Sequence, residues 1–117
     1  MTRSDDLRDA YRRSATEDEL LTAIVDAAQY QGWQVHHTRR SDLGIVQGDP
    51  GFPDLVLARL GFVLFLELKA DAGRPTTAQT EWINALGASD FGPGRRHVAM
   101  VVYPRDLDRV LEMLRDG

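Results

Sequence analysis

Apolar residues recur at helical spacing in three segments of the chain. The first stripe follows Thr16 and stops before Gly32, and the others follow Thr76 and Asp106. Such spacing places the apolar side chains on one face of each helix, where they can be buried. Residues 1–13 carry a weaker version of the pattern, which predicts either a short helix or a loose arm. The members of the three stripes are Leu20, Leu21, Ile24, Ala27 and Ala28, then Trp82, Ile83 and Leu86, then Leu107, Val110, Leu111 and Leu114.

Strand-like patterns fill the intervals between these helices. Residues 33–38 alternate, residues 54–60 and 62–69 flank a tight turn at Gly61, and residues 97–103 form another apolar run. The run before Glu67 is apolar on both faces, which is typical of an interior strand covered on both sides. The glycine-rich residues 41–52 predict an irregular loop. The expected order is α-β-β-β-α-β-α, an α/β fold with a central mixed β-sheet flanked by helices, in a single domain over residues 14–117.

Length and composition limit the class of protein. A chain of 117 residues with 43% apolar residues can bury one core, and without cysteine it forms neither disulfides nor a thiolate zinc site. We find no membrane-spanning stretch and no secretory signal, so we expect a cytoplasmic protein. The net charge of −4 does not favour a nucleic-acid binder. Three arginine pairs, at residues 12–13, 39–40 and 95–96, are either solvated or available to phosphate.

Three charged residues interrupt the apolar strands and give the first indication of chemistry. Glu67 and Lys69 lie two residues apart and project from the same face of a strand. If the strands around the turn pair as a hairpin, Asp54 lies opposite Glu67 or Lys69. Burying such charges is costly unless they pair or bind a metal, and carboxylate oxygens suit Mg²⁺ or Mn²⁺. An isolated Glu-x-Lys is usually a surface ion pair, but the apolar runs and the Phe-Pro-Asp segment favour a metal site for phosphodiester hydrolysis.

The spacing of these motifs is similar to that of a known family. The relevant segments are Gly51-Phe-Pro-Asp54, Glu67-Leu-Lys69 and Gly73-Arg-Pro-Thr76, followed by Gln79 and Trp82. Together they resemble the PD-(D/E)XK nuclease superfamily. Within it, the chain most resembles the stand-alone virus-type replication–repair nuclease (VRR-NUC) domain of phages and bacteria. The resemblance covers residues 17 to about 114.

The resemblance implies a restriction-endonuclease-like core and a hydrolase. The implied activity is a metal-dependent DNA endonuclease that leaves 5′-phosphate and 3′-hydroxyl ends. The implied cofactor is Mg²⁺ or Mn²⁺, bound by Asp54, Glu67, the backbone carbonyl of Leu68 and a carboxylate of the first helix. Lys69 would hold the attacking water or stabilise the pentavalent phosphorane. The resemblance also implies a homodimer that cuts branched DNA, as a Holliday-junction resolvase does, or that nicks duplexes.

Two residues compete for the role of the first-helix carboxylate. Glu17 extends the inward stripe of the helix, whereas Glu19 is rotated by about 200° from it. Glu19 also has a structural role available, since Thr16-x-x-Glu19 is a capping box. A rival arrangement makes Ser14 the cap and Glu17 its partner. We expect Glu17 to be the metal ligand, in agreement with the Glu-x-x-Leu pattern of the family.

The remaining candidate residues have structural explanations as well. Gln79 has capping-box spacing from Thr76, but it shares the Trp82–Ile83 face, and the resemblance places a glutamine near the metal. A histidine in the position of His37 is usually a packed residue, and we include it only as a candidate phosphate contact. Trp33 and Trp82 are expected to anchor the core. The candidate phosphate contacts are His37, Arg39, Arg40 and Arg74.

Two other functions compete with the nuclease. The first is a catalytically inactive DNA-binding or assembly module that keeps the nuclease fold. Against it stands the complete set of Glu17, Asp54, Glu67 and Lys69. The second is a metal-dependent phosphoesterase for small substrates, which needs a deep enclosed pocket that so short a chain has few residues to build.

Overall fold

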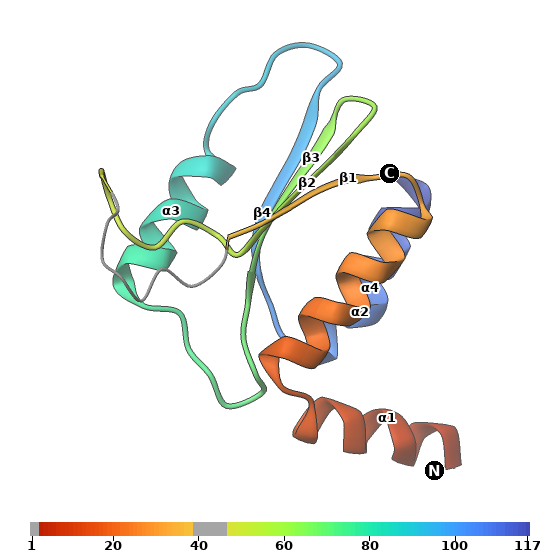
Figure 1. Cartoon of the computed structure of the whole chain (residues 1–117). Coiled ribbons are helices and arrows are strands. Elements are labelled where there is room, and N and C mark those ends of the chain that lie inside the picture. The colour runs from red at the N-terminus through yellow and green to blue at the C-terminus, as the bar shows by residue number, and fades with distance from the viewer. Residues whose placement is uncertain (1–2, 39–46) are drawn as a thin grey trace.

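The computed structural model describes residues 3–38 and 47–117, which form four helices and a four-stranded sheet (Figure 1). The expected α/β fold and the element order from the second helix onward are confirmed, and the N-terminal segment is a helix. None of the helices in the described ranges is long and apolar enough to cross a membrane. The elements are α1 (Arg3–Ser14), α2 (Glu17–Tyr30), β1 (Gln34–His37), β2 (Leu55–Arg59), β3 (Phe62–Leu68), α3 (Thr77–Gly87), β4 (Arg96–Val102), the 3₁₀ turn η1 (Pro104–Asp106) and α4 (Leu107–Asp116).

The sheet is mixed, as the sequence predicts. The strand order is β1-β2-β3-β4; β1, β2 and β3 pair antiparallel, and β4 joins β3 in parallel. The hairpin between β2 and β3 turns through Leu60 and Gly61, whose φ angles are 47° and 84°. Two successive positive φ angles are the geometry of a type I′ turn, whose twist matches that of paired strands. This turn fixes the register that later determines which side chains face each other.

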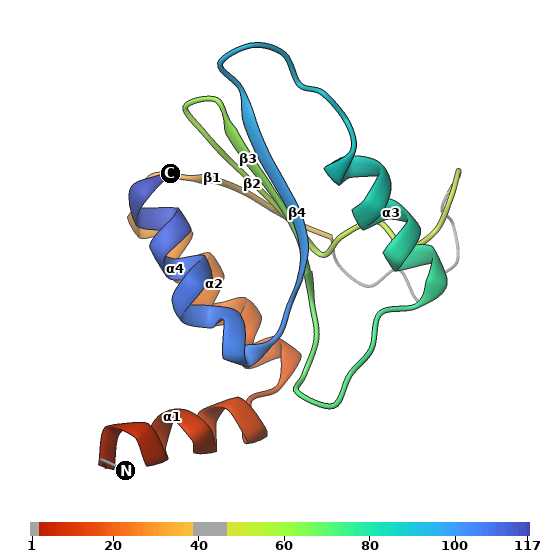
Figure 2. The ribbon, with the colours of Figure 1, turned by 180° about the vertical axis from the view of Figure 1, so that it is seen from behind.

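Helices cover the two faces of the sheet unequally. Helices α2 and α4 lie side by side on one face, and α3 alone lies on the other (Figure 2). The first face holds the main core, because alternate residues of β2 and β3 point to it together with the apolar stripes of α2 and α4. On the other face, α3 has no fully buried residue. The core residues at less than 1% exposure are Leu20, Ile24, Ala28, Leu55, Leu57, Leu64, Leu66, Val102, Val110 and Leu114.

The two tryptophans differ in their surroundings. Trp33 is buried in the core, as expected, and its indole Nε1 donates a hydrogen bond to the Leu114 carbonyl oxygen at 2.8 Å. Trp82 is only half-buried, because a single helix covers its face of the sheet. It packs edge-on against Phe52, with ring centroids 5.0 Å apart. Trp82 therefore anchors the loop before β2 to α3 and is not a residue of the main core.

Capping boxes begin both α2 and α3. The Thr16 hydroxyl accepts the Glu19 backbone N–H, and the Glu19 carboxylate accepts from the Thr16 backbone N–H. The rival cap at Ser14 is wrong, because the Ser14 hydroxyl donates instead to the Ala10 carbonyl oxygen inside α1. Glu17 is consequently free of any capping role at the start of α2.

Candidate active site

The hairpin places Asp54 against the end of β3. Leu55 pairs with Leu66, so the antiparallel register puts Asp54 opposite Glu67. The Asp54 carboxylate accepts a hydrogen bond from the Leu68 backbone N–H at 2.9 Å. Its backbone carbonyl accepts another from Thr38 at 3.0 Å. Hydrogen bonds from Leu68 to its side chain and from Thr38 to its backbone therefore hold Asp54 in place before any ligand binds.

Glu67 is the buried acid of the site. Glu67 is 1% exposed, and no group in the described part of the chain donates a hydrogen bond to either oxygen of its ionised carboxylate. Burial is the largest cause that raises the pKa of Glu67 from 4.5 to about 9, followed by a hydrogen bond from the protonated Glu67 carboxyl to the Asp54 carboxylate and by the negative charge of Asp54. The Lys69 ammonium opposes this shift, and Glu17 adds slightly to it. The side chain therefore carries a proton at neutral pH until a positive charge replaces it.

The backbone of Leu68 presents a third oxygen to the same region. In a strand, the N–H and C=O of one residue face the same neighbour. The Leu68 N–H faces Asp54, while the next N–H, that of Lys69, bonds the Val102 carbonyl oxygen on the opposite side at 2.9 Å. The Leu68 carbonyl consequently points toward the Asp54 side of β3.

A cavity of about 880 Å³ opens at this end of the sheet, between the start of α2 and the start of α3. Exposed residues such as Glu17 and His37 form part of its wall, so the cavity opens to solvent. The predicted site residues that line it are Glu17, His37, Asp54, Glu67, Leu68, Lys69 and Gln79. Lining residues that sequence analysis did not select include Arg13, Thr38 and Asp71.

The three carboxylates of the candidate site are not equally close to one another. Within residues 3–38 and 47–117, no three His, Asp or Glu side chains are gathered tightly enough to hold a metal ion as they stand. Asp54 and Glu67 are adjacent, whereas Glu17 is an exposed residue in the cavity wall. The compact part of the candidate donor set is therefore two carboxylates and one backbone carbonyl, with Glu17 in the wall of the same cavity.

Gln79 is both a capping residue and a cavity residue. Its side-chain Oε1 accepts the Thr76 backbone N–H at 2.8 Å, so the oxygen is committed to the capping box. The amide NH₂ takes no part in the capping box and remains a donor. The loop before Asp54 packs directly on this turn of α3. A Cβ added to Gly51 would lie 2.7 Å from the Ala78 carbonyl carbon and 2.8 Å from the Gln79 nitrogen.

The structure places the candidate phosphate contacts in different surroundings. His37 is exposed and lines the cavity, so it is not the packed residue that its strand position favours. Arg74 is exposed in the loop before α3, away from the cavity lining. Arg39 and Arg40 lie outside the described residues. Arg13, which the sequence showed only as half of an arginine pair, is a cavity residue because α1 ends beside α2.

Comparison with known proteins supports the fold. No protein-family model and no curated protein matches the chain. Among solved structures, one described as a "VRR_NUC domain protein" superposes with a TM-score of 0.56 and 25% identity, covering 86% of this chain and 85% of that one. A second, described as "VRR_NUC domain", gives a TM-score of 0.53 and 21% identity, covering 84% of this chain and 97% of that one. Over about 85% of its length, the chain thus has the fold of VRR_NUC domain structures.

Proposed function

We propose that the protein is a divalent-metal-dependent DNA endonuclease with Asp54, Glu67 and Lys69 at the centre of its active site. The observation that carries the proposal is Glu67, a buried carboxyl that receives no hydrogen bond within the described part of the chain and lies beside a second carboxylate. A buried carboxylate that receives no hydrogen bond destabilises a fold, so its retention at the edge of an open cavity favours a role in ligand binding. The likeness to VRR_NUC structures supports a nuclease-type hydrolase.

The donor set fits a hard divalent cation. Asp54, Glu67 and the Leu68 carbonyl supply oxygen ligands, which Mg²⁺ and Mn²⁺ prefer, and the remaining positions would be filled by water and phosphate. Such a cation polarises a phosphoryl oxygen and lowers the pKa of a bound water. Glu17 would complete the set from α2. The cation also supplies the positive charge that the Glu67 carboxylate lacks in the protein alone.

The other cavity residues can act on the phosphate directly. Lys69 projects from the same face of the chain as Glu67, so its ammonium can hold the attacking water or stabilise charge on the phosphoryl oxygens. The free amide of Gln79 can donate a hydrogen bond to a phosphate oxygen. The open, wide cavity suits a polymer lying across the sheet edge, rather than an enclosed small molecule.

A cleavage panel tests the proposal. Labelled single strand, linear duplex, flap and four-way junction are incubated with Mg²⁺, Mn²⁺ or EDTA. Wild type is compared with Lys69→Ala, and Arg95→Ala serves as a control because Arg95 is exposed beside Gly61, at the opposite end of β3. We expect metal-dependent cutting by wild type and the control and none by Lys69→Ala. Cutting by Lys69→Ala at the wild-type rate contradicts the site, and binding without cutting by wild type favours the inactive module.

Selectivity for branched DNA and a homodimer remain part of the proposal. A single active site cuts one strand, so symmetric cutting of two strands requires two copies. Preference for the four-way junction in the panel would support the resolvase activity, whereas single cuts in the linear duplex would support a nickase. Analytical ultracentrifugation of the free protein measures the dimer directly.

A further inference from the structure

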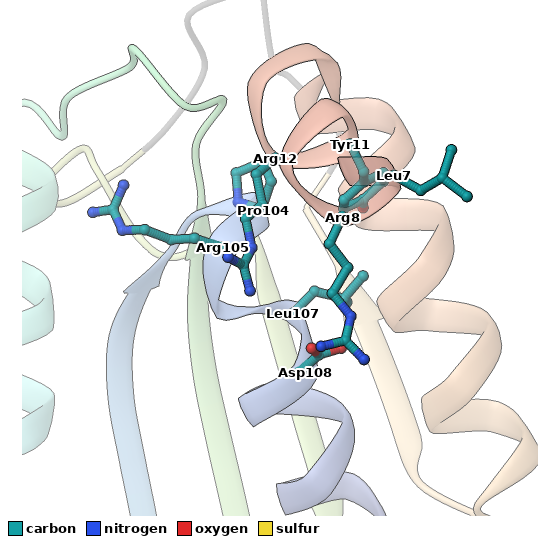
Figure 3. A pocket seen from close by; sticks show the side chains of 8 residues that line it. All are labelled: Leu7, Arg8, Tyr11, Arg12, Pro104, Arg105, Leu107 and Asp108. Carbon is teal, nitrogen blue, oxygen red and sulfur yellow. The ribbon is translucent and has the colours of Figure 1, made fainter. Parts of the chain in front are cut away.

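A second cavity, of about 430 Å³, lies between α1 and the start of α4 (Figure 3). Its charged lining consists of three arginines, Arg8, Arg12 and Arg105, and one acid, Asp108. We call this cavity the arginine groove. Positive charge is therefore concentrated here in a chain whose net charge is −4.

Local structure brings the three arginines together from distant parts of the sequence. Arg8 and Arg12 are four residues apart in α1 and so lie on one face of the helix. Arg105 belongs to η1, which follows β4 and contacts α1. Pro104, which is buried, fixes the backbone of this turn against the helix. Figure 3 shows the Arg8 and Arg12 side chains extending from α1 toward η1 and α4, whereas the Arg105 side chain starts beside them in η1 and points away from α1.

The ion pairs of Arg12 and Arg105 are weak, and the Arg105 guanidinium also lies 4.1 Å from the centroid of the Tyr103 ring, which leaves its edge open to a ligand. The Arg12 guanidinium is 3.7 Å from the Asp9 carboxylate, and both side chains are about 40% exposed. The Arg105 guanidinium is 3.9 Å from the Asp71 carboxylate, with side-chain exposures of 54% and 45%. Ion pairs this long and this exposed contribute little to stability. A phosphate, which an arginine fork binds through two parallel hydrogen bonds, can therefore replace these acids.

The arginine groove adjoins the candidate active site at two points. Arg12 lines the groove, and the next residue, Arg13, lines the active-site cavity. Arg105 lines the groove, and its partner Asp71 lines the active-site cavity. A ligand that extends out of the active site past the end of α1 therefore enters the groove.

We propose that the arginine groove binds backbone phosphates of the DNA substrate beyond the bond that is cut. The inference rests on the proposed function for the identity of the polymer. DNA is favoured over an acidic protein segment because the groove continues a cavity that is proposed to hold a phosphodiester, and because phosphates follow one another regularly along a strand. The groove would also explain how an acidic chain engages a polyanion, since the attraction depends on local charge.

The test measures binding of a fluorescent DNA duplex by anisotropy in EDTA, so that no cleavage occurs, over a series of salt concentrations. The variants are Arg12→Ala, Arg105→Ala, the triple Arg8→Ala/Arg12→Ala/Arg105→Ala and the control Arg95→Ala. Removing one arginine that binds a phosphate should lower the slope of log affinity against log salt by about 0.9. We therefore expect a reduction by about one for each single variant and by two to three for the triple, with no change for the control. Thermal melting confirms that each variant is folded.

The outcomes separate this inference from the proposed function. Unchanged slopes in the triple variant, with wild type cutting DNA, would overturn the inference and leave the nuclease intact. Slopes that fall as expected, with no cutting by wild type in any metal, would support the groove and contradict the nuclease. A triple variant that binds DNA normally but loses binding to poly-glutamate would show that the groove receives an acidic protein segment, which also overturns the inference.

Discussion

Replacing Glu67 with glutamine should stabilise the metal-free protein, although it removes a residue of the proposed active site. The folded protein holds a proton on Glu67 up to a pKa of about 9, whereas the unfolded chain releases it near 4.5. The folded state therefore binds more protons over this range, and its stability falls as the pH rises from about 4.5 to about 9. Glutamine is neutral at every pH and has nearly the same shape, so the variant should lose this dependence.

The size of the effect follows from the same pKa. Each pH unit above 4.5 lowers the wild-type free energy of unfolding by up to about 1.4 kcal/mol through this one group. At a pH of about 7.5 this group therefore lowers the wild-type free energy of unfolding by at most about 4 kcal/mol. Water entering the cavity makes the loss smaller, so we expect Glu67→Gln to be more stable than wild type by about 2 to 4 kcal/mol. For a domain of this length, that corresponds to a rise in Tm of roughly 10 °C.

Urea denaturation of both proteins between about pH 5 and pH 9 in EDTA measures the difference. The two should converge near pH 5 and diverge as the pH rises. Adding Mn²⁺ should stabilise wild type in proportion to the logarithm of its concentration and leave Glu67→Gln unchanged. A variant that is less stable than wild type at every pH, or a gap that does not depend on pH, would refute the conclusion that Glu67 is a buried acid protonated at neutral pH.

Two further substitutions test how the site is positioned. Gly51→Ala should destabilise the protein by about 2 to 3 kcal/mol, because its Cβ would lie 2.7 Å from the Ala78 carbonyl carbon at a φ of +94°. Gly48→Ala, at a φ of +93° in open space, should lose only about 1 kcal/mol, and equal losses in urea would contradict tight packing of this loop on α3. Leu60→Asn should stabilise the hairpin by about 1 kcal/mol, since Asn-Gly is favoured in the type I′ turn that Leu60 and Gly61 form. A lower Tm for that variant would show that the turn is held by its surroundings.

Much of the fold was accessible from sequence because local signals agreed with the tertiary structure. The two capping boxes mark where α2 and α3 begin, and the apolar stripes of α2 and α4 correspond to their buried faces. The short hairpin predicted Asp54 opposite Glu67 or Lys69, and the observed register selects Glu67. The capping box predicted from Thr16 and Glu19 is present, so the Glu17 side chain has no capping role, as expected.

Features that depend on contacts between distant segments were not accessible. The arginine groove joins α1 to η1, which are separated by most of the chain, and no local pattern links Arg8 or Arg12 to Arg105. The half-buried state of Trp82 depends on how many helices cover one face of the sheet, which periodicity does not determine. The placement of Asp54, Glu67 and Lys69 in one cavity was predictable because it is local, and the adjoining arginine groove was not.

The most direct test of the account is cleavage of one labelled DNA duplex by wild type, Asp54→Asn and Asp26→Asn, each with Mn²⁺ and with EDTA. Asparagine can still accept the Leu68 N–H but lacks the charge, so the fold should persist, and Asp26 is an exposed acid on α2 that serves as a control. We expect wild type and Asp26→Asn to cut only with metal, and Asp54→Asn to be slower by at least about 100-fold. Cutting by Asp54→Asn at the wild-type rate would contradict the assignment of Asp54 to a metal-dependent active site.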